Sequence, residues 1–153
     1  MAGINSNYGA NSGPVDILLV EDSSEDVELT KEALKEGKVS NILHVARDGV
    51  EAMEFLGKKG KYSGEKTPGL ILLDLNLPKK SGHEVLSEIK QDEELKIIPV
   101  VILTTSESEA DVLKTYKMHA NCYITKPVDF NQFIKVVKSI EEYWFSIVRL
   151  PKT

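Results

Sequence analysis

The sequence has little of what membrane, secreted or nucleic-acid-binding proteins require. It contains one cysteine, Cys122, so it cannot form an internal disulfide, which is typical of a reducing cytoplasm. No apolar run approaches the roughly 20 residues of a membrane helix. The formal net charge is −5, so the chain has no overall attraction to nucleic acid or to an anionic membrane. These absences predict a cytoplasmic protein that binds neither nucleic acid nor membrane and acts on other proteins.

The length and composition of the chain predict one domain. It has 153 residues, of which 41% are hydrophobic and 28% charged, as is usual for a globular protein. Residues 1–14 are rich in Asn, Ser and Gly and lack the apolar core of a secretory signal. We therefore expect a flexible leader over 1–14 and a single domain over 15–153.

Short apolar runs alternate with amphipathic stretches after the leader. The runs are rich in Ile, Leu and Val, which predicts buried parallel strands at Ile17–Val20, Ile42–Ala46, Leu70–Leu73, Val100–Leu103 and Cys122–Ile124. Helical spacing predicts helices at Ser24–Glu36, Val50–Leu56, His83–Gln91, Ser108–Met118 and Phe130–Val148. Five strand–helix repeats indicate an α/β fold with a doubly wound parallel sheet. Segment 57–69, rich in Gly and Lys, is expected to be an exposed loop.

The last predicted helix has more apolar residues than one buried face needs. Its expected core stripe follows steps of four and three: Phe133, Val137, Ile140, Trp144 and Ile147. Three further apolar residues lie outside this stripe: Tyr143, Phe145 and Val148. Surplus apolar surface of this kind predicts a protein contact.

Polar residues that could take part in a reaction or bind a ligand follow four of the predicted strands. They are Glu21 and Asp22, then Asp74 and Asn76, then Thr104, Thr105 and Ser106, and finally Lys126. The carboxyl ends of parallel strands meet at one edge, where ligands bind. Three clustered carboxylates need a cation, and hard oxygen ligands favour Mg²⁺ or Ca²⁺ over Zn²⁺. Asp74 suits a nucleophile that attacks phosphorus, while Thr104 and Lys126 suit stabilisation of the phosphoryl charge.

Four motifs lie at these strand ends: VED at 20–22, LLDLNLPKKSG at 72–82, VVILTTS at 100–106 and YITKP at 123–127. With them the chain, over about residues 15–148, resembles the receiver domain of two-component response regulators. The resemblance implies a flavodoxin-like sheet of five strands in the order 2-1-3-4-5, with five helices. It also implies phosphoryl transfer from a sensor histidine kinase, by a switch protein that is not a turnover enzyme.

The resemblance assigns a role to each motif residue. Glu21, Asp22, Asp74 and the backbone carbonyl of Asn76 would bind Mg²⁺, with Mn²⁺ or Ca²⁺ as substitutes. Asp74 would accept the phosphoryl group, which Thr104 and Lys126 would contact. Tyr123 would be the switch aromatic, and Asn76 and Ser106 would tune the lifetime of the phosphoryl group. The Lys126–Pro127 peptide bond would be cis.

A narrower resemblance concerns segments 58–69 and 141–151. They are similar to those of single-domain receivers that pair with bacterial and cyanobacterial phytochrome histidine kinases. This likeness implies a phytochrome kinase as partner and a homodimer formed through the fourth and fifth predicted helices, 108–118 and 130–148.

The same residues disfavour two other classes of function. A receiver-like docking module that never accepts phosphate is disfavoured, because the acidic pair and its partners are all intact. A phosphatase of the haloacid dehalogenase type is disfavoured because Asn76 replaces its second aspartate. A calcium loop is excluded by Pro78 and Lys79 at positions that need an oxygen ligand and a glycine.

Overall fold

A computed structural model describes residues 13–37 and 39–151. The leader expected over 1–14 lies almost entirely outside these residues. The strands are β1 (Val15–Val20), β2 (Asn41–Ala46), β3 (Leu70–Leu73), β4 (Val100–Thr104) and β5 (Cys122–Thr125). The α-helices are α2 (Ser24–Lys35), α3 (Gly49–Leu56), α4 (Gly82–Gln91), α5 (Glu109–Lys117) and α6 (Phe130–Glu141). All strands are parallel, in the order β2-β1-β3-β4-β5, so the predicted fold is confirmed.

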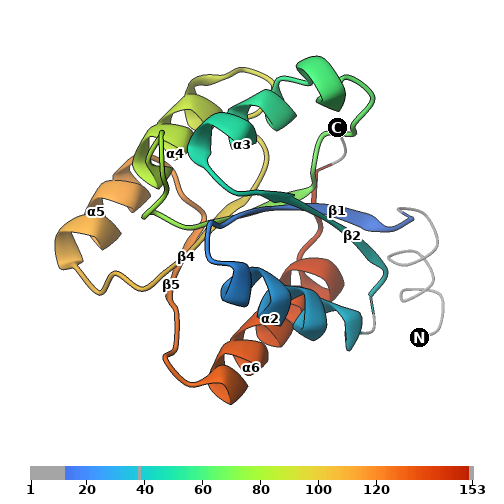
Figure 1. The fold of residues 1–153 in the computed structure, drawn as a ribbon, viewed down its shortest axis with the longest axis vertical. Coiled ribbons are helices and arrows are strands. Elements are labelled where there is room, and N and C mark those ends of the chain that lie inside the picture. The colour runs from blue at the N-terminus through green and yellow to red at the C-terminus, as the bar shows by residue number, and fades with distance from the viewer. Residues whose placement is uncertain (1–12, 38, 152–153) are drawn as a thin grey trace.

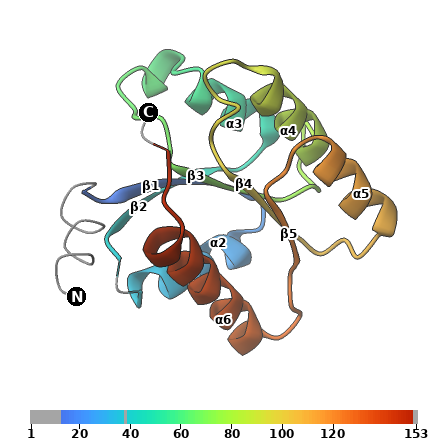
Figure 2. The same ribbon diagram turned by 180° about the vertical axis from the view of Figure 1, so that it is seen from behind.

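Helices cover both faces of the sheet. Helices α2 and α6 lie side by side on one face, and α3, α4 and α5 lie on the other (Figures 1 and 2). Neighbouring residues of each central strand serve opposite faces: Ile71 and Leu73 pack toward α3 and α4, whereas Leu70 and Leu72 pack toward α2 and α6. This two-sided burial explains why the strands read as continuous apolar runs. None of the helices in the described ranges is long and apolar enough to cross a membrane.

Each α-helix begins next to a short polar side chain that accepts a hydrogen bond from its first turn. The capping residues are Ser23, Asp48, Ser81, Ser108 and Asp129. Such a cap contributes about 1 kcal/mol to helix stability. Ser23 caps the first helix, because its hydroxyl accepts from the Asp26 amide at 3.3 Å. In this fold the caps also fix where the loops of the carboxyl edge end.

The loop at 57–69 is more ordered than its composition predicts. It contains a 3₁₀ turn, η1 (Gly60–Tyr62), and the Tyr62 ring packs edge-on against Phe55 with 5.3 Å between centroids. The Tyr62 hydroxyl donates to Glu51 at 2.6 Å. A single aromatic side chain therefore anchors the segment to α3, while the surrounding Gly and Lys residues stay exposed.

The end of the last helix does not follow the predicted spacing. After α6 the chain makes a π-helical turn, η2 (Glu142–Ile147), in which hydrogen bonds close on the fifth residue instead of the fourth. This shifts later side chains around the axis, so Phe145 is buried whereas Ile147 is 64% exposed. The predicted core stripe is right for Phe133, Val137 and Ile140 and wrong for Ile147.

The apolar residues of α5 also lie largely outside the core. Leu113 and Tyr116 of α5 are 57% and 47% exposed, and Thr115 is the buried residue of this helix. Helix α5 covers the edge of the sheet near β5, so little of its surface meets the sheet. Val112 is half-buried, and the other apolar side chains of this helix are exposed.

The shift in η2 can be tested by truncating two apolar residues of the same turn. Phe145→Ala should lower the free energy of unfolding by about 3 kcal/mol, because it leaves a cavity in the core. Ile147→Ala should change it by less than about 1 kcal/mol, because the side chain is mostly in water. Urea unfolding of both variants measures the difference. Equal losses, or a larger loss for Ile147→Ala, would show that the regular helical spacing was right.

Candidate functional site

The carboxyl edge of the sheet brings the predicted acidic residues together. Strands β1 and β3 are paired with Val20 opposite Leu73, so Glu21 and Asp74 emerge side by side. The Asp74 amide donates to the Val20 carbonyl at 3.1 Å, which continues the ladder one residue beyond the end of β3. Both carboxylates are thereby fixed by backbone pairing and not by a flexible loop.

Glu21, Asp22 and Asp74 form an acidic cluster whose oxygen atoms lie within 4.8 Å of one another. Glu21 and Asp74 are buried and Asp22 is exposed. Their burial makes mutual repulsion costly, and oxygen ligands of this type favour Mg²⁺, which also keeps several waters. The donor set thus fits the predicted divalent cation, with Asp22 on the side open to solvent.

Lys126 is the cationic group of the site. Its ammonium contacts Glu21, Asp26 at 2.7 Å and Asp74 at 3.1 Å, and its side chain is only 5% exposed. Burial opposes the charged form, but hydrogen bonds to Asp26 and Glu21 and the charge of Asp74 outweigh it, so the pKa of Lys126 is raised. Lys126 is therefore a permanent positive charge beside the Asp74 carboxylate.

Asp26 was not among the residues predicted for the site. It stands in the first turn of α2, one turn after Asp22, and reaches Lys126 across 100 residues of sequence. A helix that starts at the carboxyl edge directs its first turn toward that edge. An acidic residue three positions after the capping Ser23 is the signal that could have found it.

Burial is the main cause of the raised pKa of Glu21. The pKa of this carboxyl rises from 4.5 to about 7, and the nearby charge of Asp74 adds to the shift. Hydrogen bonds from Lys126 and from the Ser23 amide oppose it. Glu21 thus exchanges its proton near neutral pH, close to where a cation would compete for the same oxygens.

The Thr104 hydroxyl is an unused donor at the end of β4. Thr104 is completely buried, and its Oγ1 makes no hydrogen bond within the described part of the chain. A buried hydroxyl without a partner costs free energy, so it marks a place where a ligand oxygen is expected. The Lys126 amide donates to the Thr104 carbonyl at 2.6 Å, so the two residues are neighbours at this edge.

A glycine shapes the loop after Asp74. A Cβ atom on Gly82 would lie 2.2 Å from the Asp74 carbonyl oxygen, so no other residue fits without moving this backbone. Asn76 is exposed, and its amide lies 3.4 Å from Asp74 Oδ1. The metal contact expected of the Asn76 carbonyl stays a prediction.

Tyr123, the predicted switch aromatic, lies next to Ser106, one of the two residues predicted to tune the lifetime of the phosphoryl group. The Tyr123 hydroxyl donates to the Ser106 carbonyl at 3.0 Å, and its ring packs against the core on the α3–α4 side. The Ser106 hydroxyl donates to Asp111 at 2.6 Å. The structure therefore connects Ser106 to both β5 and α5.

The prediction of a cis Lys126–Pro127 bond is wrong for this structure. All peptide bonds between described residues are trans, this one included. Trans is favoured by roughly 0.5–1 kcal/mol before proline. With this isomer the Lys126 ammonium already reaches all three of its carboxylate partners.

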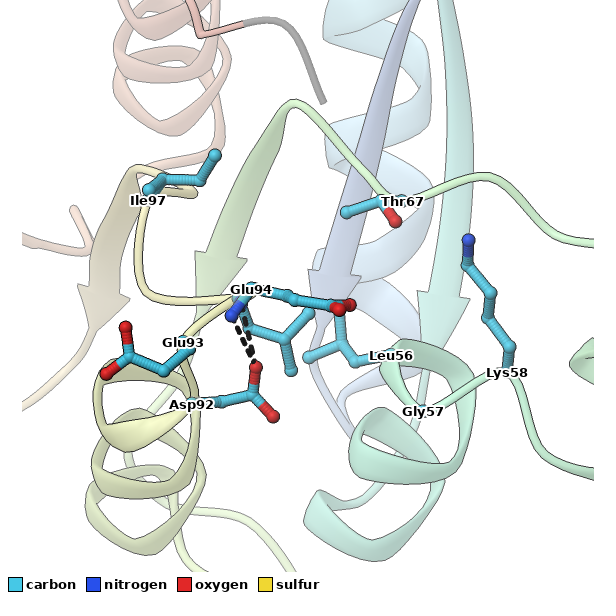
Figure 3. A pocket seen from close by; sticks show the side chains of 9 residues that line it. Leu56, Gly57, Lys58, Thr67, Asp92, Glu93, Glu94 and Ile97 are labelled. Carbon is cyan, nitrogen blue, oxygen red and sulfur yellow. Dashed lines mark hydrogen bonds between the residues drawn. The ribbon is translucent and has the colours of Figure 1, made fainter.

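A shallow pocket of about 490 Å³ lies at the opposite edge, near the ends of α3 and α4 (Figure 3). Leu56, Lys58, Asp92 and Ile97 are among the residues that line it. The Asp92 carboxylate is occupied in accepting hydrogen bonds from the amides of the next turn, at 2.8 and 3.0 Å. The pocket is thus separate from the acidic cluster and has no convergent set of free polar groups.

Comparison with known proteins agrees with this geometry. The family profile of the response regulator receiver domain matches residues 17–138. Response regulator Rcp1 of Synechocystis sp. is 51% identical over 138 residues, which are 90% of this chain and 94% of that protein. The probable methanogenesis regulatory protein FilR2 of Methanothrix harundinacea is 40% identical over 152 residues, covering 95% of this chain and 97% of its own.

Two solved structures are similar over nearly the whole chain. The crystal structure of the Mn²⁺-bound form of Rcp1 has a TM-score of 0.88 and covers 91% of this chain and 100% of that chain. The phosphorylated cyanobacterial phytochrome response regulator RcpA is 49% identical, with a TM-score of 0.89 and coverage of 92% and 100%.

The affinity of the acidic cluster for Mg²⁺ should depend on pH. Glu21 is mostly protonated at about pH 6 and mostly ionised at about pH 8, and only the ionised form binds a cation. We expect Mg²⁺ to bind about tenfold more weakly at the lower pH, measured by calorimetric titration. Glu21→Gln should bind weakly at both values and lose this dependence. The same affinity at both values in the unaltered protein would contradict the prediction.

Proposed function

This chain belongs to the response regulator receiver domain family, and on that basis we propose that Asp74 accepts a phosphoryl group from the phosphohistidine of a sensor histidine kinase. One observation carries the proposal. The Asp74 carboxylate lies between an acidic cluster suited to a cation and the Lys126 ammonium. A nucleophile and both means of stabilising the incoming charge are thus in one place.

In the proposed reaction an Asp74 carboxylate oxygen attacks phosphorus. The new oxygen–phosphorus bond forms as the bond to the histidine nitrogen breaks, and the nitrogen keeps the electron pair. The Thr104 hydroxyl, which otherwise has no partner among the described residues, donates to a phosphoryl oxygen. The Lys126 ammonium gives up part of its contact with Asp74 and contacts the phosphoryl group.

Glu21, Asp22 and Asp74 would hold Mg²⁺. When bound, the ion neutralises the carboxylates and the charge of the phosphoryl group. Without it, the acidic residues around Lys126 would repel the incoming phosphoryl group, because one ammonium faces several carboxylates.

The protein acts as a switch and not as a turnover enzyme. Phosphorylation of Asp74 is reversed by slow hydrolysis, which the residues at positions 76 and 106 modulate. A cytoplasmic location is part of the proposal, and the single cysteine of the sequence supports it.

Removal of the acceptor tests the reaction directly. Asp74→Asn should take up no label from a radiolabelled phosphorylated kinase, because the amide is not a nucleophile toward phosphorus. Asp92→Asn is a matched control: the same change at the opposite edge, at a turn that an amide side chain can also cap. It should be labelled like the unaltered protein, and only with Mg²⁺ present. Label on Asp74→Asn would show that another residue is the acceptor.

We further propose that the donor kinase is a phytochrome. RcpA, which is 49% identical to this chain, is described as a cyanobacterial phytochrome response regulator. The alternative is the kinase of another system, since the similar FilR2 is named for methanogenesis. Competition between a phytochrome kinase and an unrelated histidine kinase for the same receiver distinguishes the two, with faster labelling by the phytochrome expected.

We also propose a homodimer through the face that α5, β5 and α6 form. Leu113 and Tyr116 expose apolar surface on α5, and β5 is an edge strand. In the terminal turn Tyr143 is 52% exposed. Exposed apolar groups on helices that flank an edge strand favour association with a second copy.

The dimer is tested by replacing two aliphatic residues of similar exposure with serine. Leu113→Ser should reduce the dimer fraction in sedimentation velocity, by roughly tenfold in the dissociation constant, because it removes apolar contact. Ile42→Ser is the control, since Ile42 is 44% exposed on β2 at the other edge of the sheet. Beryllofluoride, which imitates the acyl phosphate, should increase the dimer fraction. Equal effects of the two variants would exclude this face.

A further inference from the structure

Lys126 and a bound cation would use the same two carboxylates. The ammonium contacts Glu21 Oε1 and lies 3.1 Å from Asp74 Oδ2, and both residues belong to the acidic cluster that is suited to Mg²⁺. A divalent cation on this cluster would compete for both carboxylates and would repel the ammonium, because both are positive. Lys126 therefore needs a partner outside the cluster if it is to stay at the site when a cation is bound.

Asp26 meets this need. Its Oδ2 atom lies 2.7 Å from the Lys126 ammonium. Among the carboxylates that contact the ammonium in the described part of the chain, Asp26 alone lies outside the acidic cluster. The Lys126 side chain is 5% exposed and that of Asp26 23%, so little water competes for this ion pair.

The backbone of Asp26 is held by the start of α2. Its amide donates to the capping Ser23 hydroxyl at 3.3 Å, and its carbonyl accepts from the buried Thr30 hydroxyl at 2.7 Å. These bonds do not involve the Asp26 side chain. The carboxylate can therefore keep its contact with Lys126 while the cluster binds a cation.

We propose that Asp26 is a positioning residue that retains the Lys126 ammonium when the acidic cluster binds a cation. This inference rests on the proposed function, because it supposes a cation on the cluster and a phosphoryl group that Lys126 contacts. Without the Asp26 charge the ammonium would depend on the cluster carboxylates alone, and a cation would have to displace it from them. Asp26 thus favours cation binding and keeps a positive charge beside Asp74.

Removal of the Asp26 charge should weaken the binding of Mg²⁺. In calorimetric titration at about pH 8, where Glu21 is mostly ionised, Asp26→Asn should bind Mg²⁺ roughly threefold to tenfold more weakly than the unaltered protein. Glu25→Gln is the matched control: it removes a negative charge from the same turn of α2, where the side chain is exposed. It should change the affinity by less than about twofold. Equal affinities of the two variants would overturn the inference.

A second background separates positioning from simple attraction between Asp26 and the cation. If Asp26 acts through Lys126, Asp26→Asn should have little further effect on the Mg²⁺ affinity of Lys126→Met protein, because the ammonium that it retains is gone. Simple attraction would weaken Mg²⁺ binding by the same factor in both backgrounds. An undiminished effect in Lys126→Met protein would therefore contradict a positioning role.

NMR of the lysine ammonium groups observes Lys126 without removing it. A buried, hydrogen-bonded ammonium exchanges its protons slowly enough to give a nitrogen–proton signal, and this signal should persist when Mg²⁺ saturates the unaltered protein. Addition of Mg²⁺ should broaden it in Asp26→Asn but not in Glu25→Gln. Loss of the signal from the unaltered protein on addition of Mg²⁺ would show that Asp26 does not retain the ammonium.

Failure of the proposed function and failure of this inference give different results. If a phosphorylated kinase does not label Asp74, the proposed function is wrong, whereas the Mg²⁺ titrations involve no kinase. If Asp74 is labelled and Asp26→Asn binds Mg²⁺ as tightly as Glu25→Gln, only the positioning role is wrong. If the unaltered protein binds no Mg²⁺, the cation site is wrong and the positioning role is wrong with it.

Discussion

One charge imbalance governs the carboxyl edge of this sheet. The Lys126 ammonium is shared by three carboxylates, Glu21, Asp26 and Asp74, and Asp22 adds a fourth acid. Burial, together with the nearby charge of Asp74, raises the pKa of Glu21 to about 7. The site is thereby arranged for a cation and a phosphoryl group, and its affinity for either depends on the same few side chains.

The rest of the fold serves to hold these charges. Backbone pairing between β1 and β3 places Glu21 beside Asp74, and Gly82 lets the next loop pack against the Asp74 carbonyl. The two-sided core makes the sheet rigid, because its central strands are buried on both faces. At the end of β4 the Thr104 hydroxyl, which has no partner in the described ranges, is available to a ligand.

Much of the fold and of the carboxyl edge was predictable from local patterns in the sequence. Apolar runs and the polar residues that follow them predicted every strand and the carboxylates and lysine that meet at the carboxyl edge. These patterns are visible in the sequence because the strands are buried on both faces and end at one edge. The π-helical turn of η2 was not predictable, because the apolar residues of segment 141–147 continue the regular helical spacing. The structure departs from that spacing by burying Phe145 and exposing Ile147. The loop at 57–69 was underestimated, since one anchoring residue, Tyr62, hardly changes its composition.

The sequence by itself determined the order of strands and helices along the chain, Asp74 as the proposed acceptor, and the acid pair and lysine as its expected companions. Only the tertiary structure decided which side chains meet across long separations. Asp26 reaches Lys126 over 100 residues, and Asp111 contacts both Ser106 and His83, which lies 28 residues away. Local sequence propensity indicates whether a residue lies in a strand, a turn or a helix. It does not indicate which side chain of another element will contact that residue, because this depends on how the helices pack on the sheet.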